Sequence, residues 1–151
     1  MLGISRETDY ATRVVLHLAC LEPGAQASIA EISLLRGLPV PFVRRMVGRL
    51  IKAGILQSSR GARGGVSLAR AAGAISLLDV VEATEGRIAL NICVASRQNC
   101  VMAESCPAQC AWTTATRVLV QHLATVRFDS LAASSPGHLA AHWSSRSVSQ
   151  Q

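Results

Sequence analysis

The first half of the sequence contains two short helical patterns separated by a turn. Ser28 is followed three residues later by Glu31, which is the spacing of a capping box, so a short helix is expected to begin there. Gly37 ends this helix, because glycine readily adopts the left-handed conformation that follows a helix C-terminus. A second helix is predicted from about Val40, with Pro41 in its first turn, where a missing N–H has no partner to lose. Two short helices joined by a tight turn predict a helix-turn-helix.

A glycine-rich segment at residues 60–65 follows these helices and separates two short strand patterns. Residues 55–59 and 66–68 are predicted to pair as a hairpin around it. Only 3% of the residues are aromatic while 50% are hydrophobic, so the core must consist mainly of aliphatic side chains, which suits helices. We therefore predict a mostly α fold: a winged helix-turn-helix with a small β-hairpin wing and a long C-terminal helix.

Basic residues are concentrated in the same part of the chain. The formal net charge is +6 at pH 7. No Asp or Glu lies between Ile32 and Leu78, although that stretch contains eight Arg and Lys residues. A merely solvated basic face would normally carry both signs of charge, so phosphate binding is the better interpretation. The candidate DNA-binding residues are Ser28, Pro41, Phe42, Arg44, Arg45, Arg49, Lys52, Arg60 and Arg63.

These cations are expected to play different roles on a duplex. Arg44 and Arg45 are suited to reading guanine edges or to clamping phosphates, and the later cations of the same helix to touching the backbone. Arg60 or Arg63, beside small glycines, is predicted to enter a narrow minor groove. A surface hairpin whose arginines only aid solubility is the alternative.

Five cysteines form the second informative pattern, and four of them lie between positions 93 and 110. Cys93, Cys100 and Cys106 are widely spaced, and Cys110 follows one helical turn later if a helix starts there. Their odd number and crowding are a poor disulfide framework but suit soft-metal or redox chemistry. Wide gaps favour an iron-sulfur cluster over zinc, which more often uses Cys-x-x-Cys pairs. A thiol switch and a structural zinc remain alternatives, and Cys20 is expected to be an incidental packing thiol.

The N-terminus lacks a charged segment followed by an apolar run, and no segment is apolar for long enough to span a bilayer. We therefore expect a soluble, cytoplasmic protein with no membrane partner. The four histidines are scattered and no nucleophile–base pair stands out, so no enzyme is predicted. A small iron-sulfur electron carrier is a further alternative, but it would leave the acid-free basic stretch unexplained.

Several segments carry distinctive patterns: TDYA at 8–11, IAEI at 29–32, LIKAG at 50–54, RGARGG at 60–65, ISLLDVV at 75–81 and the three spaced cysteines. Together they resemble the bacterial iron-sulfur winged-helix transcription regulators of the IscR, NsrR and RirA family. The resemblance covers the chain up to about Leu131.

The resemblance implies a homodimer joined through the long C-terminal helix, with a two-iron or four-iron cluster held by the three spaced cysteines. The fourth ligand differs between branches of the family. In the IscR-like branch it is a histidine at the position of Gln109, so this site departs from that pattern. In the NsrR-like branch it is an aspartate of the partner subunit's first helix, which Asp9 matches. Asp9 is therefore predicted ahead of Cys110, although it could also be an ordinary helix-start carboxylate.

The sequence thus predicts a homodimeric transcription regulator, and more specifically a repressor. Residues 1–75 form its DNA-binding domain, residues 76–133 the cluster-binding loop and dimerisation helix, and residues 134–151 a flexible tail. Its partner is double-stranded DNA with a roughly palindromic operator, bound in a strongly salt-dependent way. An iron-sulfur cluster sensing nitric oxide, iron supply or redox state is predicted to control that binding.

Overall fold

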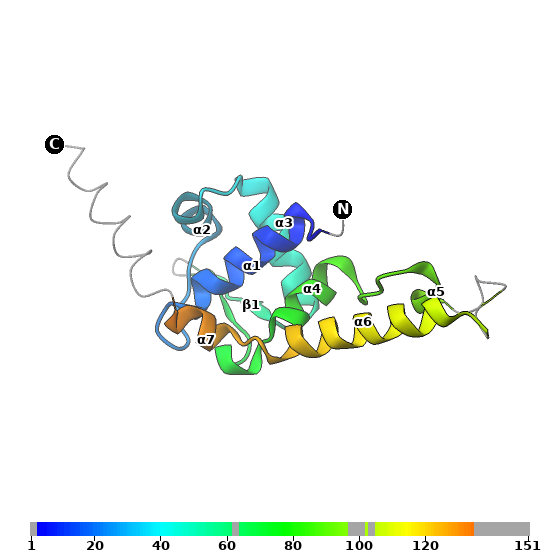
Figure 1. The fold of residues 1–151 in the computed structure, drawn as a ribbon. Helices are drawn as coiled ribbons and strands as arrows, with labels where there is room; N and C mark the ends of the chain where they lie inside the picture. The colour runs from blue at the N-terminus through cyan, green and yellow to red at the C-terminus, as the bar shows by residue number, and fades with distance from the viewer. Residues whose placement is uncertain (1–2, 62–63, 97–101, 103–104, 135–151) are drawn as a thin grey trace.

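The computed structural model of the protein describes residues 3–61, 64–96, 102 and 105–134. Arg63 and Cys100, both predicted site residues, lie outside the described residues, as does the predicted tail beyond Ser134. The elements, in chain order, are α1 (Arg6–Ala19), α2 (Ile29–Arg36), α3 (Val40–Lys52), β1 (Leu56–Ser58), β2 (Val66–Leu68), the 3-10 turn η1 (Ala72–Ala74), α4 (Leu77–Glu85), α5 (Ile92–Ala95), α6 (Pro107–Thr125) and α7 (Phe128–Ala133) (Figure 1).

Local sequence signals set the ends of the short helices. Ser28 Oγ accepts a hydrogen bond from the backbone N–H of Glu31 at 3.1 Å, and the Glu31 carboxylate accepts one from the Ser28 N–H at 3.4 Å. This is the predicted capping box of α2, and Gly37 ends the helix with a φ of +63°. Ser76 and Asp79 form a second capping box at the start of α4. The predicted boundaries of α2 are confirmed.

The core lies where α1, α3 and α4 pack against one another. The predicted apolar face of α3 is buried, since Val43, Met46 and Leu50 have no exposed surface and Val47 only 5%. Each side chain of this kind stabilises the fold by roughly 1.5–3 kcal/mol relative to its exposed state. Burial of this face leaves the polar side of α3 to face outward or toward α1.

The predicted hairpin is present as an antiparallel pair in which Leu56 lies opposite Leu68. Ala27, just before α2, forms two backbone hydrogen bonds with Val66 at 2.9 and 3.0 Å. A side chain at Gly65 would meet the Ala27 carbonyl oxygen at 2.9 Å, so this glycine permits a close approach of two backbones. The wing is therefore attached to the start of the helix-turn-helix.

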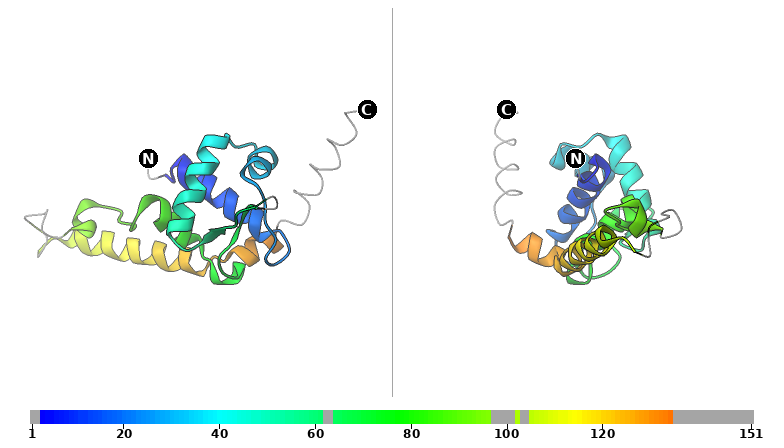
Figure 2. Two further views of the ribbon diagram at one scale, coloured as in Figure 1. Left: turned by 180° about the vertical axis from the view of Figure 1, so that it is seen from behind. Right: turned by 45° about the vertical axis from the view of Figure 1, so that its right-hand side comes forward.

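The C-terminal part of the chain leaves the helical body and returns to it. α6 extends away from α1 and α3, with α5 beside its distal end (Figure 1), and Figure 2 shows the same extension from behind. The helix begins at Pro107 and is the predicted long C-terminal helix. The sequence pattern did not reveal α7, whose Phe128 is fully buried and donates its N–H to the Ile75 carbonyl at 3.1 Å. No helix in the described part of the chain is long and apolar enough to cross a membrane.

His17 is a buried polar residue of α1, with only 2% of its surface exposed. Neither ring nitrogen has a hydrogen-bond partner among the described residues. Burial lowers the pKa of His17 below 6.5, and the charge of Arg36 lowers it further, while Glu31 opposes the shift. The folded protein therefore favours the neutral imidazole.

Acidification is expected to destabilise the fold through His17. The unfolded chain takes up this proton near pH ~6.5 and the folded chain only at lower pH, so the free energy of unfolding falls below that point, by at most about 1.4 kcal/mol per pH unit. Urea denaturation at pH ~7 and ~5.5 measures the loss. We expect His17→Gln to reduce this loss of free energy of unfolding. His122→Gln, on the exposed side of α6, should leave the loss unchanged. Equal losses in the wild type and His17→Gln would contradict this expectation.

Candidate DNA interface and cysteine segment

The exposed part of α3 presents the predicted cations on two sides of the helix. Arg44 and Lys52 are exposed and make no ion pair with any residue that the structure describes. Phe42, Arg45 and Arg49 recur at the i, i+3, i+7 spacing of one helix face, and that face lies against α1. Of the four predicted cations of α3, Arg44 and Lys52 therefore have no ion pair with a described residue, whereas Arg45 and Arg49 face α1.

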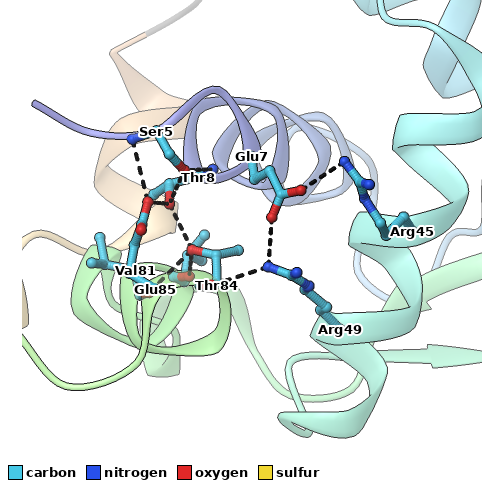
Figure 3. A network of polar contacts seen from close by, with 9 residues as sticks. Ser5, Glu7, Thr8, Arg45, Arg49, Val81, Thr84 and Glu85 are labelled. Atoms are coloured by element: carbon cyan, nitrogen blue, oxygen red, sulfur yellow. Dashed lines mark hydrogen bonds and ion pairs between the residues drawn. The ribbon is translucent and has the colours of Figure 1, made fainter.

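Glu7 of α1 binds both arginines on the inward face. One carboxylate oxygen lies 2.6 Å from Nη2 of Arg45, and the other lies 2.6 Å from Nη1 of Arg49 (Figure 3). Arg49 Nη1 also donates to the backbone carbonyl of Thr84 at 3.1 Å. The guanidinium groups of Arg45 and Arg49 are thus held by the protein itself.

Phe42 lies at the N-terminal end of the same face. Its ring packs edge-on against Tyr10 of α1 with centroids 5.8 Å apart. The Arg45 guanidinium lies 4.8 Å from the centroid of the Phe42 ring, within the range of a cation–π contact. Phe42 retains 39% exposure, so it both contacts α1 and borders the outward face of α3.

The other predicted DNA contacts border α3. Ser28 is exposed while its hydroxyl oxygen caps α2, and Pro41 is exposed in the first turn of α3. Arg60 is exposed at the described edge of the wing tip. Close to it, the backbone N–H of Gly64 donates to the Gly61 carbonyl at 2.8 Å, which closes the turn. Among the described cationic residues of the helix-turn-helix and the wing, Arg44, Lys52 and Arg60 are therefore exposed without an ion pair.

A three-helix junction lies on the inner side of α3, where Arg49 was the one residue that the sequence analysis had predicted to be functional. We use this name for Glu7, Thr8, Arg49, Thr84 and Glu85. The Thr8 hydroxyl is 2.7 Å from the Thr84 hydroxyl and donates to the Glu85 carboxylate at 2.6 Å (Figure 3). Hydrogen bonds from Ser5 and then Thr8 lower the pKa of Glu85. Spacing along the chain could not have revealed this group, because its members come from α1, α3 and α4.

The cysteine segment, a name used here for α5 and the first turn of α6 with Cys93, Cys106 and Cys110, lies at the far end of the molecule from β1 (Figure 1). Cys93 of α5 and Cys110 of α6 line one cleft of about 370 Å³, together with Val94, Gln109, Thr113 and Thr114. Cys106 is half-buried and is the N-cap residue of α6. Among the described residues, no three His, Cys, Asp or Glu side chains converge as a metal site.

Asp9, the predicted fourth ligand, lies on α1 and not on the cleft. Its carboxylate pairs with Arg13 one helical turn later at 2.9 Å, and about half of each side chain is exposed. Exposed pairs of this kind contribute only about 0.3–0.5 kcal/mol, so Asp9 is readily released to another partner. Within one subunit Cys93 therefore shares its cleft with Cys110 and not with Asp9.

Comparison with known proteins places this arrangement in a family. The Rrf2 family, described as iron-dependent transcriptional regulators, matches residues 4–134. Protein aau3 of Rhizobium meliloti strain 1021 is 31% identical over 137 residues, which are 89% of this chain and 88% of that protein.

Solved structures share the fold. CymR, the global cysteine regulator of B. subtilis, has a TM-score of 0.74 and 25% identity, over 88% of this chain and 98% of its own. The oxidized form of Staphylococcus aureus CymR has a TM-score of 0.67 and 26% identity, over 87% and 96%. IscR of T. potens has a TM-score of 0.69 and 23% identity, over 88% of each chain. With its mostly helical winged fold and a family match across nearly the whole described chain, the protein belongs to the Rrf2 family of DNA-binding transcription regulators.

Proposed function

We propose that the protein is a homodimeric, cytoplasmic repressor whose operator binding is controlled by an iron-sulfur cluster that responds to nitric oxide, iron supply or redox state. The observation that supports the proposal is that exposed cations and free thiols lie in two separate parts of the chain. Residues 1–75 expose Arg44 and Lys52 beside a basic wing, while residues 76–133 bring thiols together on a cleft at the other end.

The outward face of α3 is suited to the major groove of a duplex. Arg44 offers a planar fork for guanine or phosphate, and Lys52 offers a compact charge for the backbone. Arg60, at the edge of the wing, lies where a hairpin can reach an adjacent minor groove. No acid between Ile32 and Leu78 opposes this contact, although Glu7 of α1 lies on its inner side.

A second copy of the chain would place two such faces on one operator. Trp112 and Val118 are large apolar residues of α6 that remain 39% and 57% exposed. Pairing α6 with its copy would cover them. A symmetric dimer reads two half-sites about one helical turn apart, which predicts a roughly palindromic operator.

The cysteines fit an iron-sulfur cluster by their donor chemistry. Cys93, Cys106 and Cys110 are free thiols, and soft thiolates are the ligands that such clusters prefer. The cluster would supply redox-active iron, which reacts with nitric oxide or oxidants. We propose Cys93, Cys100 and Cys106 as ligands, with Asp9 of the partner subunit or Cys110 in the fourth place.

Anaerobic purification followed by iron, sulfide and zinc analysis tests this assignment. Cys93→Ala and Cys106→Ala are expected to abolish bound iron and sulfide, whereas Cys20→Ala, at the end of α1, retains both. Asp9→Ala and Cys110→Ala decide the fourth ligand, because the variant that lacks this ligand is expected to retain less iron than the other. Zinc without sulfide would end the cluster proposal. Gel shifts of the loaded and metal-free protein then measure the effect on operator binding.

A thiol switch without metal is the second candidate. Cys93 and Cys110 line the same cleft, and the similar CymR of S. aureus has a structure of an oxidized form. Under this alternative the purified protein contains no iron. Peroxide then weakens operator binding, dithiothreitol restores it, and Cys93→Ser removes the response.

A further inference from the structure

We propose that the three-helix junction passes changes in the cysteine segment to α3, with Glu7, Thr8 and Thr84 as positioning residues. The inference rests on the proposed function, because it explains how a change at the cysteines reaches the DNA-binding helix. It adds residues that lie neither on the cysteine cleft nor on the outward face of α3.

The first step is the link between α4 and α3. Thr84 lies in the last turn of α4, where backbone carbonyls have no partner within the helix and carry the negative end of the helix dipole. Arg49 of α3 donates to the Thr84 carbonyl at 3.1 Å and so binds the end of α4. A movement of this last turn therefore removes or redirects a partner of Arg49.

The second step is the link from α1 to both helices. Glu7 holds Arg45 and Arg49 with one oxygen each, so the two guanidinium groups move together. Thr8, only 1% exposed, donates to Glu85 and contacts the Thr84 hydroxyl, which ties the start of α1 to the end of α4. Ser5 adds a backbone N–H to Glu85 at 3.3 Å.

The third step connects the junction to the cysteines. Cys93 follows Glu85 by only eight positions. Gly86, with a φ of +80°, directs the chain out of α4, and the N–H of Leu90 donates to Thr116 of α6 at 3.3 Å. A short connection therefore joins the last turn of α4 to α5. A rearrangement of α5 against α6 would displace this connection and, with it, the last turn of α4.

The consequence concerns Arg45 and Arg49, which carry charge next to the DNA-facing side of α3. When the junction is intact, the Glu7 carboxylate partly neutralises the charge of both arginines. These ion pairs also set where α3 lies relative to α1 and α4. When the last turn of α4 shifts, both arginines change partners together. Coupling between distant sites requires a contact that can adopt two discrete arrangements, and this pair of arginines provides one.

Operator affinity of cluster-loaded and metal-free protein tests the junction. For the wild type we expect the two Kd values to differ by roughly 5- to 150-fold, the usual range of such coupling. In Glu7→Gln the ratio is expected to fall to within about threefold of one. Glu22→Gln, which makes the same charge change on the exposed turn after α1, should keep the wild-type ratio.

A matched pair at Thr8 separates coupling from loss of stability. Thr8→Val keeps the shape and removes the hydroxyl, so we expect it to reduce the ratio, whereas Thr8→Ser keeps the hydroxyl and the ratio. Hydrogen exchange in the metal-free protein adds a readout without the cluster: amides at the end of α4 should exchange faster in Thr8→Val and Glu7→Gln. If these residues had a purely structural role, their substitution would weaken operator binding of the cluster-loaded and the metal-free protein equally. The ratio of the two Kd values would then stay unchanged, and this result would overturn the inference. A wild-type ratio of one would instead overturn the proposed function.

Discussion

Replacement of Arg44 by alanine is expected to weaken operator binding by about 1–3 kcal/mol, or roughly 5- to 150-fold. Arg44 is exposed on α3 and makes no ion pair with the described residues, so its charge and its donors are available to a duplex. The loss is greatest if the guanidinium reads a guanine edge, because the unpaired base acceptors then lose two hydrogen bonds.

The salt dependence of the Kd distinguishes the two possible contacts of Arg44. If it binds a phosphate, the slope of log Kd against log salt should become shallower by about one in Arg44→Ala. If it reads a base, the slope changes little and discrimination between operator and unrelated DNA falls. Arg13→Ala is the matched control, because it removes the same charge from α1, where Arg13 pairs with Asp9. Equal effects of the two variants would show that only net charge matters and would remove α3 from the proposed interface.

Phe128→Ala is expected to lower the free energy of unfolding by about 3–5 kcal/mol. Phe128 has no exposed surface and belongs to the same core as α1 and Ile75, although it lies near the end of the described chain. A domain of this size is stable by only about 5–15 kcal/mol, so the variant should lose a large part of its stability.

Thermal and guanidinium unfolding measure this loss, and the chain offers a matched control in its second phenylalanine. Phe42 is 39% exposed and contacts Tyr10 at its edge, so Phe42→Ala should cost less than half as much. Similar losses for the two variants would mean that α7 does not contribute to the core. If α7 does contribute, the winged helix-turn-helix depends for its stability on a segment that follows α6 in the chain.

Several features of this protein were determined by short-range sequence signals. The capping boxes at Ser28 and Ser76 and the stop at Gly37 involve neighbours within a few residues, so their hydrogen bonds hardly depend on the rest of the fold. The buried face of α3 likewise follows from its helical period. The winged helix and its hairpin were predictable for this reason.

The pairing of distant residues was decided only by the tertiary structure. Glu7 and Arg49 lie in different helices, and no local pattern distinguishes an arginine that faces DNA from one that binds a carboxylate on α1. The same holds for Phe128, which α7 returns to the core, and for Cys110, which shares a cleft with Cys93 because α5 packs against α6. Hydrogen bonds within a turn are encoded by neighbouring residues, whereas contacts across helices depend on how the apolar faces pack, and that packing is a property of the whole chain.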